Sequence, residues 1–198
     1  MPTSHWMQLN ELVTVLRAAD PKCVLDIGVG YGKFGVLARE YLELWDGRND
    51  YETRDRRIDG IEIFSAYQNP IYTWVYDNVY YGDASIVAPE LSTKYDLVLM
   101  IDVLEHFDRE SGIRLLKGLL ERGQGVLVST PHQPSAQGAA FGNEHETHVS
   151  KWGLQDLQDL GFELFSIPNP RSLLCYMGKS AKQVCDKVRS HGIPAEAS

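Results

Sequence analysis

The chain has 198 residues, of which 43% are hydrophobic and 23% are charged, and its formal net charge is −8. These values are typical of a globular domain and exclude a disordered or collagen-like chain. The acidic balance argues against a nucleic-acid partner, because proteins that bind a phosphate backbone usually present a basic surface. The one basic cluster, Arg54, Arg56 and Arg57, is interrupted by Asp55 and is typical of a solvated loop.

No apolar run reaches the roughly 18 residues that a membrane span needs. The first ten residues lack the cationic start and apolar block of a secretory signal, so we expect a cytoplasmic protein with no membrane partner. Cys23, Cys175 and Cys185 have no CxxC spacing, which predicts neither a disulfide framework nor a thiolate zinc site. We interpret them as packing residues.

Strand-like and helical hydrophobic periods alternate along the chain, which indicates β and α units over a parallel sheet. After a helix at 6–19, strands are expected at 23–27, 58–63, 79–82, 95–101 and 125–130, with helices at 32–44, 65–77 and 109–122. A helix at 151–160 leads into strands at 162–167 and 173–177, and a last helix covers 179–190. The proline-rich turn at 168–170 predicts an antiparallel hairpin. The long loops at 45–57 and 133–147 are typical of functional or mobile segments.

Three glycines, Gly28, Gly30 and Gly32, stand at alternate positions between the first strand and the next helix. Glycine permits sharp turns and lets the backbone approach a ligand, and in open α/β sheets this turn binds nucleotide-like ligands. Dinucleotide folds use the different spacing G-x-G-x-x-G around a pyrophosphate. Here Asp26 precedes the glycines; it would repel a pyrophosphate but can bind the ammonium of an amino acid, directly or through water. The spacing therefore favours S-adenosylmethionine over a nicotinamide cofactor.

Carboxylates also follow the next strands. Glu62 ends the second strand, where it can accept hydrogen bonds from both ribose hydroxyls. Asp83, followed by Ala84, comes after the third strand and is expected to meet the adenine amino group. Asp102 ends the fourth strand at the rim of the same crevice. Acidic residues at four successive strand ends are hard to attribute to packing, so they support the cofactor interpretation.

These motifs resemble those of the class I S-adenosylmethionine-dependent methyltransferases. In chain order the similar segments are DIGVGYG at 26–32, IEIF at 61–64, GDA at 82–84, YDLVLMIDVLEHF at 95–107 and VLVSTP at 126–131. The Leu-Glu-His sequence at 104–106 resembles a group that includes ubiquinone-biosynthesis O-methyltransferases and many small bacterial enzymes. The resemblance implies a Rossmann-like three-layer α/β/α sandwich with a seven-stranded, mostly parallel sheet in the order 3-2-1-4-5-7-6, strand 7 being antiparallel.

On this basis we expect one domain over 1–198, with an N-terminal helix in 1–20, a catalytic core in 21–178, and a C-terminal helix and tail in 179–198. The N-terminal part is short, and no separate substrate-binding domain is expected. The resemblance implies that S-adenosylmethionine is bound, and S-adenosylhomocysteine released, by Asp26, Gly28, Gly30, Gly32, Glu62, Ile63, Asp83, Ala84 and Asp102.

Methyl transfer is an in-line displacement in which the protein's main task is alignment, and an oxygen acceptor also profits from a base. The candidate bases near the crevice are His106, His132, His145 and His148. Of these we select His106 and His148, together with Glu146, as candidate catalytic residues. The alternative is structural: His106 shapes its loop, and the segment 147–152 anchors a helix with Ser150 as its N-cap.

We expect no metal, but Glu105, His106 and His148 form an alternative divalent-metal set. Some relatives, including small-RNA 2′-O-methyltransferases, pair a Glu-His after strand four with a later histidine, and carboxylate and imidazole ligands suit several divalent ions.

The expected function is methyl transfer to a small-molecule acceptor, with oxygen slightly preferred because of the histidines. One alternative is a non-catalytic S-adenosylmethionine-binding module that acts as a regulator or partner. A nicotinamide-dependent oxidoreductase is a third, which the glycine spacing disfavours. The sequence does not specify the acceptor or the oligomeric state.

Overall fold

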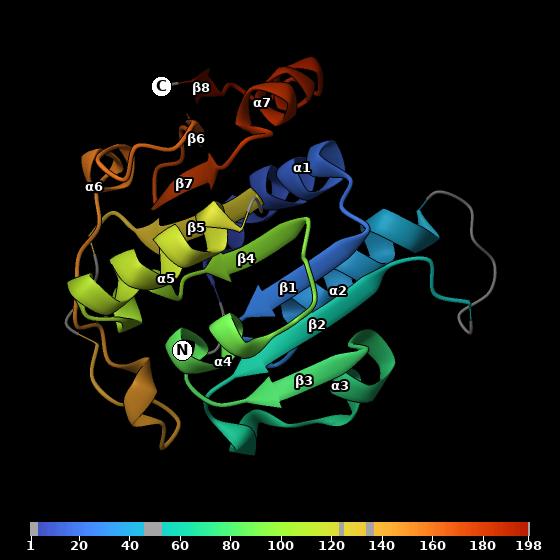
Figure 1. The fold of residues 1–198 in the computed structure, drawn as a ribbon, viewed down its shortest axis with the longest axis vertical. Helices are drawn as coiled ribbons and strands as arrows, with labels where there is room; N and C mark the ends of the chain where they lie inside the picture. The colour runs from blue at the N-terminus through green and yellow to red at the C-terminus, as the bar shows by residue number, and fades with distance from the viewer. Residues whose placement is uncertain (1–3, 46–52, 123–124, 134–136, 198) are drawn as a thin grey trace.

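The computed structural model describes residues 4–45, 53–122, 125–133 and 137–197. Its centre is a twisted sheet in the order β3-β2-β1-β4-β5-β7-β6-β8, with helices on both faces (Figure 1). This arrangement confirms the predicted three-layer sandwich and the predicted order 3-2-1-4-5-7-6. The sheet has eight strands, so the expected count of seven is corrected by one.

The first five strands are mutually parallel, and β7 is antiparallel to both of its neighbours, as predicted. The additional strand β8 pairs with β6 through Phe165–Ala197 and Ser166–Glu196. It was not predicted because two residues are too few to show an alternating pattern. The bounds are β1 Cys23–Ile27, β2 Arg57–Glu62, β3 Asn78–Tyr81, β4 Leu97–Ile101, β5 Gly125–Pro131, β6 Leu164–Ile167, β7 Ser172–Met177 and β8 Glu196–Ala197.

Two hydrophobic cores lie between the sheet and the helices that pack against it. One core joins the sheet to α1, α2, α3 and α7, and the other joins it to α4, α5 and α6 (Figure 1). All five residues of β4 are buried, as expected of a central strand covered on both faces. The helices are α1 Leu9–Ala19, α2 Lys33–Arg39, α3 Pro70–Val75, α4 Ala84–Glu90, α5 Arg109–Glu121, α6 Leu154–Gln158 and α7 Ala181–Ser190.

Two predicted helices are shorter or more divided than expected. The helix predicted at 65–77 is a 3-10 turn, Ser65–Tyr67, followed by α3, because Pro70 fits only the first turn of a helix. The helix predicted at 32–44 begins after Gly32, and its second half, Glu40–Leu44, is a π-helix.

Helix α4 was not predicted at all. It has only seven residues, and Pro89 lies inside it, so it shows no long apolar stripe. Helix α6 was predicted over 151–160 with Ser150 as its N-cap, but its N-cap is Gly153. Parts of both predicted loops, 46–52 and 134–136, lie outside the described residues.

The three cysteines are free thiols, and Cys175 and Cys185 are buried in the two cores. In the described part of the chain, no helix combines the length and the apolar character needed to cross a bilayer. The carboxyl ends of β1, β2 and β4 meet at one edge of the sheet, which is where an open α/β fold binds its ligands.

Candidate active site

The chain turns sharply after β1 at three glycines with positive φ: 77° at Gly28, 56° at Gly30 and 90° at Gly32. Side chains are strained in this left-handed region, so the turn requires glycine. The Gly28 amide donates to the Ile61 carbonyl at 2.9 Å, which holds the turn against β2. A Cβ atom on Gly28 would lie 2.5 Å from Val103 Cγ2. The backbone of the glycine turn is therefore not covered by its own side chains, so a ligand can approach it at this edge of the sheet.

Glu62 ends β2 directly beside the glycine turn and is only 3% exposed. Its Oε2 accepts the Gly30 amide at 2.8 Å, and its Oε1 accepts the Phe64 amide at 2.8 Å. Burial raises the pKa of Glu62, and the nearby charge of Glu146 acts in the same direction. Each carboxylate oxygen can accept a further hydrogen bond. The side chain therefore fits the ribose-binding role expected from the sequence.

A cavity, called here the cofactor cavity, runs along this edge of the sheet. Asp83 lies on its wall as the N-cap of α4, where its Oδ1 accepts from the amide and the hydroxyl of Ser85 at 2.8 and 2.7 Å. Phe34, Tyr67 and Phe107 provide apolar lining. The predicted cofactor residues that line the cavity are Gly28, Gly30, Glu62, Ile63, Asp83, Ala84 and Asp102.

The structure places the two other predicted cofactor residues, Asp26 and Gly32, off this wall. Asp26 is 1% exposed, and the Tyr76 hydroxyl donates to its Oδ2 at 2.5 Å. Burial raises the pKa of Asp26 to about 7. Gly32 is the N-cap of α2. The side chain of Asp26 is thus held by Tyr76 in the interior, and its direct contact with the cofactor stays a prediction.

Sequence reasoning missed Lys33, which opens α2 and lines the cofactor cavity. Its Nζ donates to Ser4 Oγ at 2.6 Å, so the N-terminal segment also reaches the cavity. Burial lowers the pKa of Lys33, while the charge of Asp102 opposes this shift. The signal was its position directly after the third glycine. There an ammonium group can bind the carboxylate of an amino-acid tail.

A second cavity, called here the acceptor cavity, shares Asp102 and His106 with the cofactor cavity. Asp102 has a positive φ of 53° and is held from two sides. Its Oδ1 accepts Ser129 Oγ at 2.6 Å, and its Oδ2 accepts Nε2 of the buried Gln8 at 2.8 Å. The carboxylate is therefore fixed where the two cavities meet.

His106 lies in the 3-10 turn Leu104–His106 that follows β4. Its Nδ1 is 3.0 Å from the Thr147 carbonyl oxygen. A carbonyl oxygen can only accept, so Nδ1 carries the hydrogen, and Nε2 of the neutral ring has a free lone pair. Burial lowers the pKa of His106, which favours the neutral ring. Nε2 is thus able to accept a proton or bind a metal ion.

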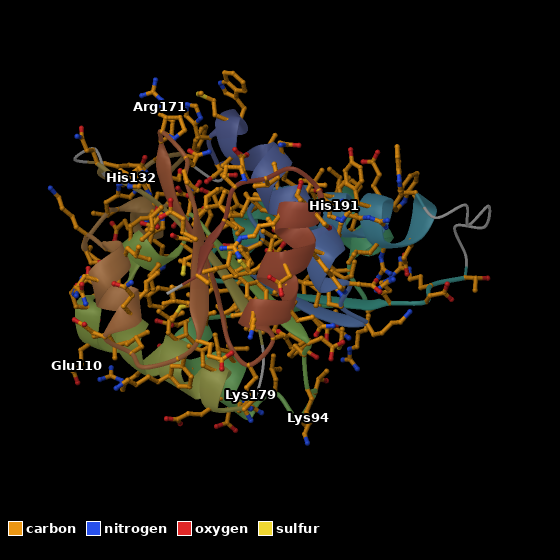
Figure 2. All side chains as sticks on the ribbon, turned by 90° about the horizontal axis from the view of Figure 1, so that it is seen from above. Lys94, Glu110, His132, Arg171, Lys179 and His191 are labelled. Carbon is orange, nitrogen blue, oxygen red and sulfur yellow. The ribbon has the colours of Figure 1, made fainter. Side chains whose placement is uncertain are left out.

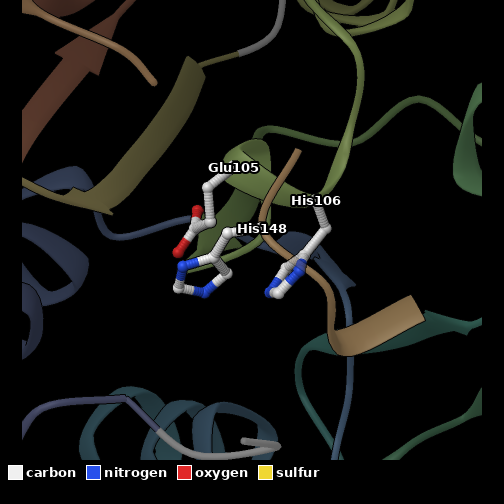
Figure 3. Close-up of side chains that lie close together, drawn as sticks. All are labelled: Glu105, His106 and His148. Atoms are coloured by element: carbon white, nitrogen blue, oxygen red, sulfur yellow. The ribbon is translucent and has the colours of Figure 1, made fainter. Parts of the chain in front are cut away.

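Glu105, His106 and His148 lie together in the lining of the acceptor cavity (Figure 3). One candidate ligand atom from each lies within 4.8 Å of the other two. Glu105 is 1% exposed, and its Oε2 has no hydrogen-bond partner among the described residues. Burial, assisted by the charge of Asp102, raises the pKa of Glu105 to about 8. The structure brings the alternative metal set together, and its donor chemistry fits a divalent ion.

The remaining candidate residues divide between the two cavities. Glu146 is buried, accepts the Tyr67 hydroxyl at 2.9 Å, and lines the cofactor cavity with His145. His132 and His148 line the acceptor cavity. Only His106 among the predicted catalytic residues borders both.

Residues 5–179 match the protein family described as Methyltransferase domain. The chain belongs to this family. This match confirms the predicted resemblance to the class I S-adenosylmethionine-dependent methyltransferases. It also confirms the predicted cofactor, S-adenosylmethionine, which defines that class. No curated protein matches the chain.

Several solved structures share the fold. An O-methyltransferase family protein from Burkholderia thailandensis has 14% identity and a TM-score of 0.60, over 87% of this chain and 56% of that one. An O-methyltransferase from neocarzinostatin biosynthesis, with bound S-adenosyl-L-homocysteine and 1,4-dihydroxy-2-naphthoic acid, has 15% identity and a TM-score of 0.57, over 87% and 54%. The methyltransferase domain of bacterial CtHen1 has 18% identity and a TM-score of 0.54, over 86% and 97%. The chain thus spans little more than half the length of the two O-methyltransferases.

The role of Glu62 leads to a binding prediction. Replacing Glu62 with glutamine is expected to weaken S-adenosylhomocysteine binding about ten- to hundredfold, measured by titration calorimetry. The amide NH2 group cannot accept from a backbone amide or a ribose hydroxyl, whichever oxygen it replaces. Glu90→Gln, at the exposed end of α4, is the control and should bind like the wild type. Equal affinities for the two variants would show that Glu62 does not hold the cofactor.

Proposed function

We propose that this protein is a methyltransferase that transfers a methyl group from S-adenosylmethionine to a hydroxyl group of a small molecule. The observation that carries the proposal is the junction of the cofactor and acceptor cavities at Asp102 and His106. A molecule in the acceptor cavity meets the cofactor where a free imidazole nitrogen is available. The neocarzinostatin O-methyltransferase, crystallised with a dihydroxynaphthoic acid, supports a hydroxylated small molecule as the acceptor class.

The cofactor residues divide the binding work. Glu62 accepts hydrogen bonds from the ribose hydroxyls, and Asp83 accepts a hydrogen bond from the adenine amino group. Lys33 binds the carboxylate of the amino-acid tail. When bound, S-adenosylmethionine supplies a methyl carbon on a positively charged sulfur. Holding this carbon in line with the acceptor oxygen provides most of the rate enhancement, because alignment removes a large entropic cost.

His106 acts as the base in this mechanism. Its Nδ1–H is held by the Thr147 carbonyl, which orients Nε2 as the proton acceptor. Nε2 takes the proton of the acceptor hydroxyl as the oxygen–carbon bond forms and the carbon–sulfur bond breaks, with the electron pair staying on sulfur. His148, whose ring centroid lies 5.0 Å from that of His106, and Glu146 complete the polar surroundings.

A second form of the proposal assigns a divalent ion to Glu105, His106 and His148. The buried Glu105 oxygen without a partner in the described chain favours it, because an unpaired buried carboxylate oxygen is costly. The ion would polarise the acceptor hydroxyl as a Lewis acid. In this form the three side chains bind the ion, and His106 does not act as a base.

The test is methyl transfer from radiolabelled S-adenosylmethionine to a panel of small phenols and alcohols. His106→Asn is expected to lower kcat about a hundredfold or more and to leave S-adenosylhomocysteine affinity unchanged, because it loses the base at Nε2 while its side-chain NH2 group can take the place of Nδ1 and donate to the Thr147 carbonyl. His191→Asn, at the exposed end of α7, is the control. Loss of turnover after exhaustive chelation would select the metal form, and full activity would select the base form. Tight cofactor binding without methylation of any panel member would instead favour the non-catalytic module.

A further inference from the structure

Arg171 differs from the other arginines that the structure describes. Its guanidinium has no hydrogen-bond or ion-pair partner among the described residues, although acidic residues outnumber basic ones by 27 to 19 in the whole chain. The other described arginine side chains all donate to a carboxylate or a backbone carbonyl: Arg17, Arg39, Arg54, Arg56, Arg57, Arg109, Arg114, Arg122 and Arg189. Arg171 is therefore available to bind an anion.

The backbone that carries Arg171 is held firmly by Asn169, which is 8% exposed. Asn169 Oδ1 accepts the amides of Arg171 at 2.9 Å and Ser172 at 3.2 Å, and its Nδ2 donates to the Met7 carbonyl at 3.1 Å. On the other side, the His132 amide donates to the Arg171 carbonyl at 3.1 Å. An arginine on a fixed backbone loses less entropy on binding than one on a free loop.

Arg171 lines the acceptor cavity together with His5 and His132. Figure 2 shows Arg171 and His132 on the same edge of the molecule. Arg171 lies in the turn that joins β6 to β7, and His132 directly follows β5. Asp102 and His106 form the part of the cavity that borders the cofactor. The cavity thus has one carboxylate, Asp102, and one base, His106, where it meets the cofactor cavity, and a cationic group on its β7 side.

The strand order gives the approximate distance between Asp102 and Arg171 across the cavity. Asp102 follows β4, and β5 lies between β4 and β7, so two strand spacings, roughly 10 Å, separate the backbones of β4 and β7. Arg171 lines the cavity and is exposed, so a molecule bound in the cavity can reach its side chain. A span of roughly 10 Å fits a molecule with one or two rings.

We propose that the acceptor is a hydroxy acid, whose carboxylate binds Arg171 while its hydroxyl group faces His106 and Asp102. This inference rests on the proposed function and adds the chemical class of its substrate. The planar guanidinium binds a carboxylate through two parallel hydrogen bonds, which fixes direction as well as position. One unpaired arginine matches one negative charge. A nucleic-acid strand would need several such cations, and the net charge of −8 opposes it.

The experiment titrates the protein, loaded with S-adenosylhomocysteine, with 3-hydroxybenzoate, 4-hydroxybenzoate and 1-hydroxy-2-naphthoate, and with the neutral carboxamide of each. At least one acid is expected to bind about tenfold more tightly than its amide, and Arg171→Gln should remove this difference. Arg114→Gln, an exposed arginine on α5, is the matched control and should keep it. Binding of the amides and of S-adenosylhomocysteine should be the same in all three proteins.

Equal binding of acid and amide by the wild type, no binding of any acid, or an unchanged preference in Arg171→Gln would overturn the inference. So would a short single-stranded RNA that binds more tightly than every acid. In each of these cases intact S-adenosylhomocysteine binding and methyl transfer to a neutral phenol would leave the proposed function standing. Failure to bind S-adenosylhomocysteine would instead refute the proposed function itself.

Discussion

Replacing Gly28 with valine is expected to abolish cofactor binding, with a loss in affinity of roughly a hundredfold or more. Gly28 has a φ of 77°, and a Cβ atom there would lie 2.5 Å from Val103 Cγ2. The variant must therefore move either the glycine turn or Val103, and both line the cofactor cavity. Calorimetric titration with S-adenosylhomocysteine measures the effect, and circular dichroism shows whether the variant is folded.

Gly161 provides a control that separates backbone strain from blockage of the cavity. Its φ is 79°, almost the value at Gly28, but a Cβ atom there would meet no described atom within 4 Å beyond its own chain neighbours. Gly161→Val should cost about 1 to 2 kcal/mol of stability and leave cofactor affinity intact. Wild-type affinity in a folded Gly28→Val protein would mean that the cofactor does not bind against this turn.

The second large expected effect is that the buried Asp26 makes the stability of the fold depend on pH. Burial raises its pKa from 3.8 to about 7, so the folded protein keeps a proton that the unfolded chain releases. Stability is then fully present at low pH and falls as the pH rises from about 4 to about 7, by about 1.4 kcal/mol per pH unit. Asp26→Asn removes this loss because asparagine is always neutral and can still accept from the Tyr76 hydroxyl.

The measurement is urea unfolding of the cofactor-free protein at pH 5 and pH 7. Between these values the wild type is expected to lose about 2 to 3 kcal/mol more than Asp26→Asn. Asp186→Asn, exposed on α7, should behave like the wild type. Equal losses in wild type and Asp26→Asn would show that Asp26 is ionised in the fold. A large loss of cofactor affinity in Asp26→Asn would support the direct contact predicted from the sequence.

The central strands were predictable because each is a short apolar run, and the family resemblance supplied the order in which they lie in the sheet. The resemblance also supplied the antiparallel direction of β7. Helix α4 was not predictable in the same way, since it begins at the cap Asp83, contains Pro89 and has only seven residues. Strand β8 depends on pairing with β6, a contact between distant parts of the chain that no local pattern records.

The site shows the same division. Gly28, Glu62 and Asp83 were identified because their role follows from their place at strand ends, and all three line the cofactor cavity. The environment of Asp26 was not predictable, because its partner Tyr76 lies 50 residues away. The proposed role of Arg171 depends on its guanidinium having no acidic partner among the described residues. The sequence alone does not show such a relation.

Strand β8 has a consequence for the behaviour of the protein in solution. It covers Phe165 and Ser166 on the outer edge of β6, where backbone groups would otherwise be unpaired. Open edges of this kind are templates on which another chain can add a strand, and native proteins commonly cover them. Removing residues 196–197, for example to obtain crystals, is therefore expected to expose the backbone groups of Phe165 and Ser166 and to promote self-association of the protein.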